Sequence, residues 1–142
     1  MAGNREPRSE QGNALVESAL TLPLLLLLTI GLLQAGLLGY GSLLAGEAAR
    51  HGARMGSVVQ GNAAAVAQAE AWDEAQAAFP AAVPHVQVLA PGGVPGSELT
   101  LEVVYEIPNL FSRAGMTTLF SGLPSGSSLT VQRRVTFRQE GW

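Results

Sequence analysis

Few side chains in this sequence have the types and spacing that catalysis or metal binding requires. The 142 residues include no cysteine, which excludes a disulfide, an iron–sulfur cluster, a thiolate zinc site and a thiol nucleophile. The two histidines, His51 and His85, lie far apart, and no G-x-S-x-G, phosphate-loop or dinucleotide motif is present. The densest acidic group, Glu70 with Asp73 and Glu74, has the spacing of a solvated helix face. We therefore expect neither enzymatic activity nor any catalytic, cofactor-binding or metal-binding residue.

The charge balance also restricts the classes of partner that this protein can bind. All 8 basic residues are arginines, the formal net charge is -3, and only 13% of the residues are charged. A protein that binds nucleic acid through its backbone phosphates needs a basic surface, which this composition does not provide. We expect no nucleic-acid partner and no small-molecule substrate.

A long uncharged stretch near the N-terminus predicts a transmembrane helix. Residues 18–46 carry no formal charge, and residues 19–33 are dominated by leucine. As a helix, residues 18–46 would be about 43 Å long, more than the roughly 30 Å hydrocarbon core requires. We place the membrane span at about 18–40, with a bend at Pro23, which cannot donate to the carbonyl of Ala19. A cleaved secretory signal is the alternative, but the apolar run is long and no clear A-x-A site follows it.

Arginines flank both ends of this span and do not decide its orientation. Arg5 and Arg8 precede the helix, whereas Arg50 and Arg54 follow it, so the positive-inside rule gives a tie. Because most of the chain follows the span, we predict a single-pass protein with its N-terminus inside and its C-terminal domain outside. Arg50 and Arg54 are predicted to contact the membrane interface or to form a solvated face.

Glu17 places a carboxylate in the first turn of the apolar helix. Charged groups at the bilayer centre cost roughly 2.5–3.5 kcal/mol, so they usually have a partner. Glu17 either reaches headgroups and water at the interface or pairs with a cation. Gly12 lies five residues before it, at the border between a polar leader and the apolar run.

Several short motifs occur in order along the N-terminal 57 residues. They are Gly12, Val16-Glu17-x-Ala19, Pro23 before a leucine run, and Ala48-Ala49-Arg50-x-Gly52-Ala53-Arg54. With these motifs the segment resembles the TadE-like family, the pseudopilins or minor pilins of the tight-adherence (Flp) pilus system. In the wider type IV pilin-like superfamily, a prepilin peptidase cuts after a glycine at the membrane face, and a glutamate follows at the fifth position of the processed chain. Position 34 is Gln where the family commonly has an acidic residue.

This resemblance implies a structural component of a pilus or related secretion apparatus in the bacterial inner membrane. Cleavage after Gly12 would remove the leader, residues 1–12, and make Asn13 the first residue. The Glu17 carboxylate of one subunit would then neutralise the Asn13 amine of a neighbour and fix the stagger between subunits. The implied partners are other pilin-like subunits, the lipid bilayer and a prepilin peptidase. The alternative is an uncleaved single-pass envelope protein, of TadG-like or other secretion-accessory type, outside the pilus.

Small residues recur every four positions along the helix, which predicts close helix–helix packing. Such stripes let backbones approach in a membrane, although a composition rich in Gly and Ala also produces the spacing by chance. We predict assembly contacts at the first stripe. The stripes are Gly31, Ala35 and Gly39, then Gly41, Ala45, Ala49 and Ala53, with Gly52 and Gly56 beside them.

The remainder, residues 58–142, predicts a small soluble α+β domain. A helix is expected over 63–79, with Asn62 as its N-cap and an apolar stripe on which Trp72 is the core anchor. Three strands are expected over 84–90, 97–107 and 128–138, the first two joined as an antiparallel hairpin. The fold class is therefore α+β: a long transmembrane helix (within residues 13–57), a second helix and a three-stranded antiparallel sheet.

Charged residues in the last two predicted strands, and apolar residues between these strands, predict what each segment contacts. Arg133 interrupts an apolar face, which indicates an edge strand or a bulge. Glu102 and Glu106 are expected to pair with Arg134 and Arg138 across the sheet. Residues 109–127 carry several apolar side chains, which predicts packing over the sheet or, alternatively, a contact site.

Overall fold

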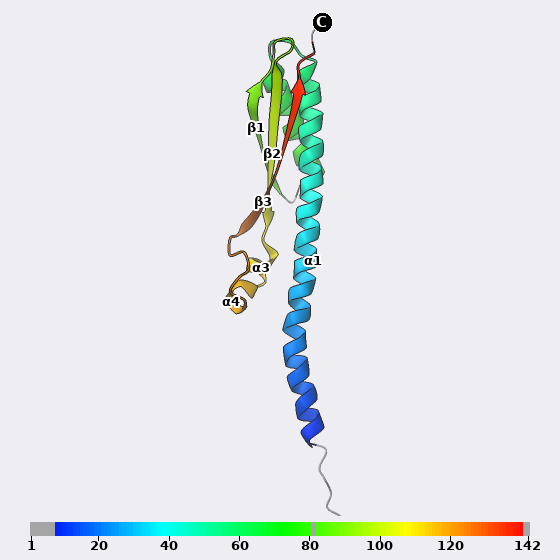
Figure 1. The fold of residues 1–142 in the computed structure, drawn as a ribbon, viewed down its shortest axis with the longest axis vertical. Helices are drawn as coiled ribbons and strands as arrows, with labels where there is room; N and C mark the ends of the chain where they lie inside the picture. The colour runs from blue at the N-terminus through cyan, green and yellow to red at the C-terminus, as the bar shows by residue number, and fades with distance from the viewer. Residues whose placement is uncertain (1–7, 81, 141–142) are drawn as a thin grey trace, which may run out of the picture.

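One long helix carries a small helix-and-sheet domain along its C-terminal half (Figure 1). The structure is a computed structural model that describes residues 8–80 and 82–140. Helix α1 (Arg8–Ser57) continues through Pro23 and comprises 50 residues, which corresponds to a length of about 75 Å. The predicted long N-terminal helix is confirmed.

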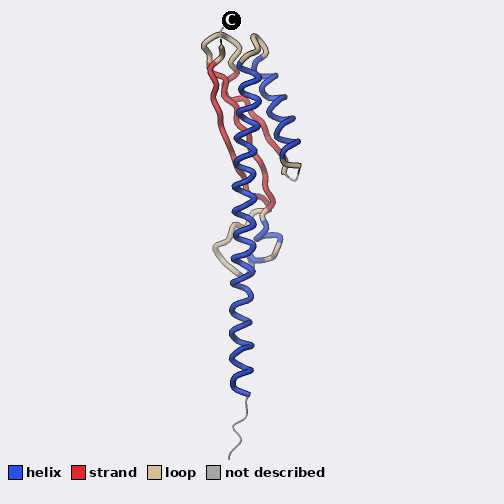
Figure 2. The backbone as a smooth tube through the Cα atoms, turned by 90° about the vertical axis from the view of Figure 1, so that its right-hand side faces the viewer, coloured by secondary structure: helices blue, strands red, loops and turns tan. Residues whose placement is uncertain are grey.

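The rest of the chain, residues 58–140, is called the sheet domain below. It contains α2 (Ala63–Ala78), β1 (Val83–Pro91), β2 (Glu98–Pro108) and β3 (Ser128–Arg138). The strands form an antiparallel sheet in the order β1-β2-β3. The C-terminal half of α1 lies over β2 and β3, and α2 lies over β1, so both helices cover one face of the sheet (Figure 2). The α+β fold class is confirmed.

The central strand β2 supplies the core, on the face that alternation predicted. Its five inward side chains are fully buried, and burying a large apolar side chain contributes about 1.5–3 kcal/mol. Burial, and then the nearby charge of Glu74, raises the pKa of the Tyr105 hydroxyl. This hydroxyl therefore stays protonated and donates to the carbonyl oxygen of Ala75 at 2.7 Å. The five residues are Leu99, Leu101, Val103, Tyr105 and Ile107.

The contact between α1 and α2 is made of alanine and glycine, which corrects the predicted apolar stripe. Trp72 was expected in the core, but its side chain is 44% exposed. A tryptophan does not fit between these helices, because even a Cβ at Gly52 would lie 2.5 Å from the Cβ of Ala71. Asn62 precedes α2 as predicted, but its side chain makes no capping hydrogen bond. The buried face of α2 consists of Ala63, Ala67, Ala71 and Ala75.

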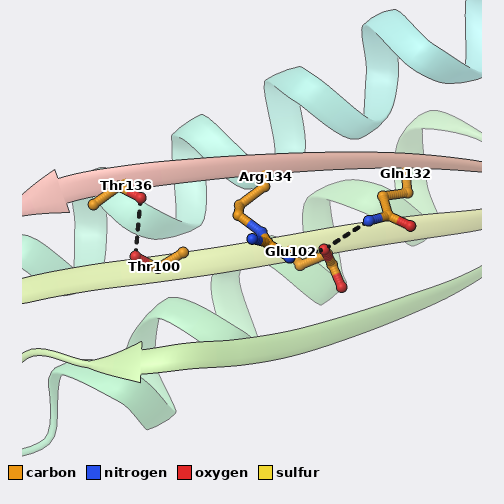
Figure 3. A network of polar contacts seen from close by, with 5 residues as sticks. All are labelled: Thr100, Glu102, Gln132, Arg134 and Thr136. Atoms are coloured by element: carbon orange, nitrogen blue, oxygen red, sulfur yellow. Dashed lines mark hydrogen bonds and ion pairs between the residues drawn. The ribbon is translucent and has the colours of Figure 1, made fainter.

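On the outer face of the sheet, one of the two predicted ion pairs forms. The carboxylate of Glu102 accepts from Arg134 and from Gln132, each at 3.0 Å (Figure 3). The predicted pair of Glu106 with Arg138 is wrong, because the register places Glu106 opposite Thr130. Register is set by the whole length of the strands, which charge type alone does not reveal.

Arg133 lies on an edge strand, as its position in the pattern predicted. It is opposite Val103 on the face covered by α1, and its guanidinium donates to the hydroxyl of Ser42. The bulge lies elsewhere, in β1 between Val88 and Ala90.

Candidate functional site

The N-terminal part of α1, residues 12–33, is mostly exposed and extends past the end of the three-stranded sheet (Figure 1). It is called the exposed segment below. α1 is long and apolar enough to cross a membrane once, and only 6% of its most apolar window is buried. A core helix of a soluble protein would bury these side chains, so a single membrane crossing is the better account. The large apolar side chains exposed here include Leu15, Val16, Leu20, Leu22, Leu24, Leu25, Leu26, Leu28, Leu32 and Leu33.

Gln34 marks the end of the exposed segment, because only 2% of it is accessible. Beyond it, Leu37 and Leu38 pack against the core of the sheet domain. The 22 residues of the exposed segment span about 33 Å, which matches the roughly 30 Å hydrocarbon core. Ala35, Gly39 and Leu43 beyond Gln34 are also exposed, so the span at about 18–40 stays a prediction.

Glu17 lies within the exposed segment and is itself exposed. No ion pair to its carboxylate is present among the described residues. The Thr21 hydroxyl donates to the backbone carbonyl of Glu17 at 2.7 Å. It therefore does not serve the carbonyl of Ala19, which Pro23 leaves without its helical donor.

Gly12 and Asn13, the predicted processing residues, are exposed near the N-terminal end of α1. A Cβ added at Gly12 would meet nothing within 4 Å. The predicted leader, residues 1–12, lies partly outside the described residues, which begin at Arg8. Cleavage after Gly12 stays a prediction.

The two stripes of small residues have different environments. In the second stripe, Gly41, Ala45, Ala49 and Ala53 are buried against the sheet domain, so their packing is intramolecular. In the first stripe, Ala35 and Gly39 are exposed, whereas Gly31 is half-buried near the ring of Phe111. A subunit contact through the first stripe therefore stays a prediction for Ala35 and Gly39 in particular.

Arg50 and Arg54 lie far along α1 from the exposed segment. Arg50 is 16 residues beyond Gln34, which is about 24 Å along a helix. Its guanidinium pairs with the carboxylate of Glu47 at 2.6 Å, and both side chains are more than half exposed. A solvated face, the other interpretation of these arginines, agrees better with this position, and the interface assignment stays a prediction.

The segment between β2 and β3, residues 109–127, does not pack over the sheet as expected. This connecting loop forms α3 (Leu110–Arg113) and α4 (Met116–Leu119) and lies past the end of the sheet, beside α1 (Figure 1). The backbone N–H of Leu110 donates to Oε1 of Gln34 at 2.7 Å. The Nε2 atom of Gln34 is buried and has no partner among the described residues.

Asn109 holds the connecting loop closed and was not recognised from the sequence. It is fully buried. Its Oδ1 accepts from the N–H groups of Phe111 and Ser112, at 3.1 and 3.4 Å. Its Nδ2 donates to the carbonyls of Pro124 and Gly126, at 2.7 and 2.8 Å. All four hydrogen bonds of this amide are therefore made within one loop.

Replacing Asn109 with alanine should open this loop and lower the free energy of unfolding. Buried backbone groups left without partners cost about 1–3 kcal/mol. Thermal unfolding of the detergent-solubilised chain measures the effect. Asn62→Ala is the matched control, because Asn62 makes no side-chain capping bond. Equal melting temperatures for the two variants would contradict the role given to Asn109.

The two histidines and their acidic neighbours, on α1 and in the sheet domain, form separate surface contacts. His51 lies 3.5 Å from Glu70, and His85 lies 3.7 Å from Glu106, with all four side chains roughly half exposed. Over residues 8–80 and 82–140 there is no cluster of three metal-ligating side chains. The candidate functional site is therefore the surface of α1, together with the connecting loop beside it.

Comparison with known families supports this choice of site. Residues 12–54 match the family described as TadE-like protein. The match begins at Gly12 and includes Glu17, the exposed segment and most of the helix covered by the sheet domain. It confirms the resemblance found in the sequence. The chain matches no curated protein and no solved structure.

Proposed function

Because the N-terminal helix of this chain is TadE-like, we propose that the protein is a pseudopilin-like structural component of a tight-adherence (Flp-type) pilus or related secretion apparatus. The observation that supports this proposal is that the N-terminal and C-terminal parts of α1 have different environments. The family match over residues 12–54 includes both parts. The N-terminal part, residues 12–33, is apolar, mostly exposed and in contact with the connecting loop, whereas much of the C-terminal part is buried under the sheet. A subunit that assembles through its membrane helix needs this free surface.

The proposed assembly joins exposed segments of neighbouring subunits side by side. Ala35 and Gly39 follow the exposed segment along α1, and both are also accessible. Their small side chains would allow close approach of a second helix. After cleavage, Glu17 would pair with the amine of Asn13 on the neighbour, because each charge is costly when alone in lipid. The role is structural, and we propose no catalytic step. We place the protein in the bacterial inner membrane, with its N-terminus inside and the sheet domain outside.

Mass spectrometry of the protein from cells that produce the pilus tests this function. We expect a chain that begins at Asn13, is present in the sheared pilus fraction or its membrane base, and depends on a prepilin peptidase. Gly12→Leu should keep residues 1–12, because in pilin-like precursors the peptidase cuts after a glycine, whereas the fold has room for a side chain at this position. An intact N-terminus in the wild-type cells would support the alternative, an uncleaved TadG-like envelope protein. Loss of the gene without loss of pili would contradict a role in the pilus.

A further inference from the structure

The connecting loop, residues 109–127, lies against a part of α1 that must be inside the membrane. Residues 12–23 precede the contact and span only about 18 Å as a helix, which is too short for a hydrocarbon core of roughly 30 Å. Residues 24–33 must therefore lie in hydrocarbon if α1 crosses the membrane. An apolar groove of about 540 Å³ lies on this stretch, lined by α1 between Leu24 and Leu32 and by Phe111 and Leu123 of the loop.

From this geometry we propose that the connecting loop inserts into the leaflet next to the sheet domain, and that phospholipid acyl chains fill the groove between the loop and α1. Leu28, in the groove, is six residues before Gln34, or about 9 Å deeper along the helix. With Gln34 placed at the membrane boundary, this distance agrees with the 5–10 Å to which interfacial apolar faces enter a bilayer.

The hydrogen bonding of the loop fits an environment without water. Irregular backbone at membrane depth is tolerated only when its polar groups find partners in the protein. Here Asn109 satisfies two N–H groups and two carbonyls of the loop, and its own N–H donates to Ser127. The N–H of Leu110 is satisfied by Gln34. The closed loop can therefore lie against lipid without exposing those groups.

Several apolar side chains of the loop are accessible to lipid, beside exposed hydroxyl side chains such as those of Thr118 and Ser121. Leu119, at the end of α4, is 73% exposed. Phe111, Phe120 and Leu123 are only partly covered. The loop contains no carboxylate, and its one ionisable residue, Arg113, is exposed and can reach lipid phosphates. Apolar side chains with an arginine beside them are typical of a segment that lies in the membrane interface.

Site-directed spin labelling in liposomes of phosphatidylcholine and phosphatidylglycerol tests the insertion. The natural chain has no cysteine, so a single introduced cysteine gives one labelled position in the full-length protein. Leu119→Cys reports on the loop. Val94→Cys is the matched control, because Val94 is 65% exposed but lies at the opposite end of the sheet, in the β1–β2 hairpin. Leu25→Cys, in the exposed segment, is the reference for lipid.

We expect label at position 119 to collide with oxygen more than with a water-soluble nickel chelate, in a ratio like that at position 25 and severalfold above that at position 94. A ratio at 119 equal to that at 94, with position 25 in lipid, would overturn the proposal and leave the membrane anchor standing. Spin–spin broadening at 119 that dilution with the cysteine-free chain removes would show a second copy in the groove, which also overturns it. Water accessibility at all three positions would overturn the membrane span itself. The proposal rests on this span and not on the pilus assignment.

Discussion

Replacing Gly52 with alanine should push α2 away from α1 and lower the free energy of unfolding of the sheet domain by about 1–3 kcal/mol, the usual cost of overpacking. A Cβ at this position would clash with the backbone carbonyl of Ala67 and would lie 2.9 Å from the backbone nitrogen of Ala71. Backbone atoms in a helix cannot move aside singly, so the whole of α2 must shift. The gain in helix propensity from Gly to Ala, about 1 kcal/mol, offsets only part of this cost.

Gly39→Ala is the matched control for this experiment. It makes the same chemical change in the same helix, but a Cβ at Gly39 would meet nothing within 4 Å. We expect this variant to be as stable as the natural chain or more stable, because only the helix propensity changes. Chemical unfolding in mild detergent, followed by near-ultraviolet circular dichroism, measures both. Equal stability of the two variants would show that the α1–α2 contact is looser than the structure indicates.

The strands and the long helix could be predicted because their patterns are strong and local. In β2, apolar residues alternate over the whole strand, and the face carrying Leu101 and Tyr105 is the buried one. A period of two leaves little choice of face once the strand is recognised. The uncharged stretch over residues 18–46 likewise predicted a membrane helix by its length.

The face of α2 could not be predicted, because it depends on the surface of another helix. Hydrophobicity favours a stripe through Trp72, but α1 presents Gly52 and Gly56 to α2. Only alanine is small enough for such a close approach, and α2 therefore turns Ala67 and Ala71 toward α1. The glycines on α1 contain this information, although nothing in α2 itself reveals it.

The connecting loop was missed for a related reason. Its position depends on the hydrogen bond from Leu110 to Gln34, which joins residues 76 positions apart. Sequence patterns identify elements over about ten residues and carry no direct signal for such a contact. The same bond holds the connecting loop against α1 at Gln34, whereas Ala35 and Gly39 beyond it are exposed, so the span expected at about 18–40 stays a prediction.

Replacing Glu17 with glutamine should leave membrane insertion and the sheet domain intact but abolish assembly into the pilus. Glu17 is exposed, and no ion pair to it is present in the described part of the chain, so the isolated subunit loses nothing. Insertion should be slightly favoured, because a neutral amide is less costly in lipid than a carboxylate. In the assembly, however, the neighbour's Asn13 amine would be left unpaired, and breaking a buried pair costs about 3–5 kcal/mol.

The control must remove a carboxylate from α1 without affecting the exposed segment. Glu47→Gln does this, since Glu47 pairs with Arg50 at the solvated surface and both side chains are more than half exposed. Such a pair contributes about 0–1 kcal/mol, so this variant should assemble normally. Carbonate extraction measures insertion, and the amount of protein in the sheared pilus fraction or its membrane base measures assembly. If Glu17→Gln assembles as well as Glu47→Gln, charge pairing at Glu17 does not set the stagger between subunits, and the small residues Ala35 and Gly39 would have to set it through packing alone.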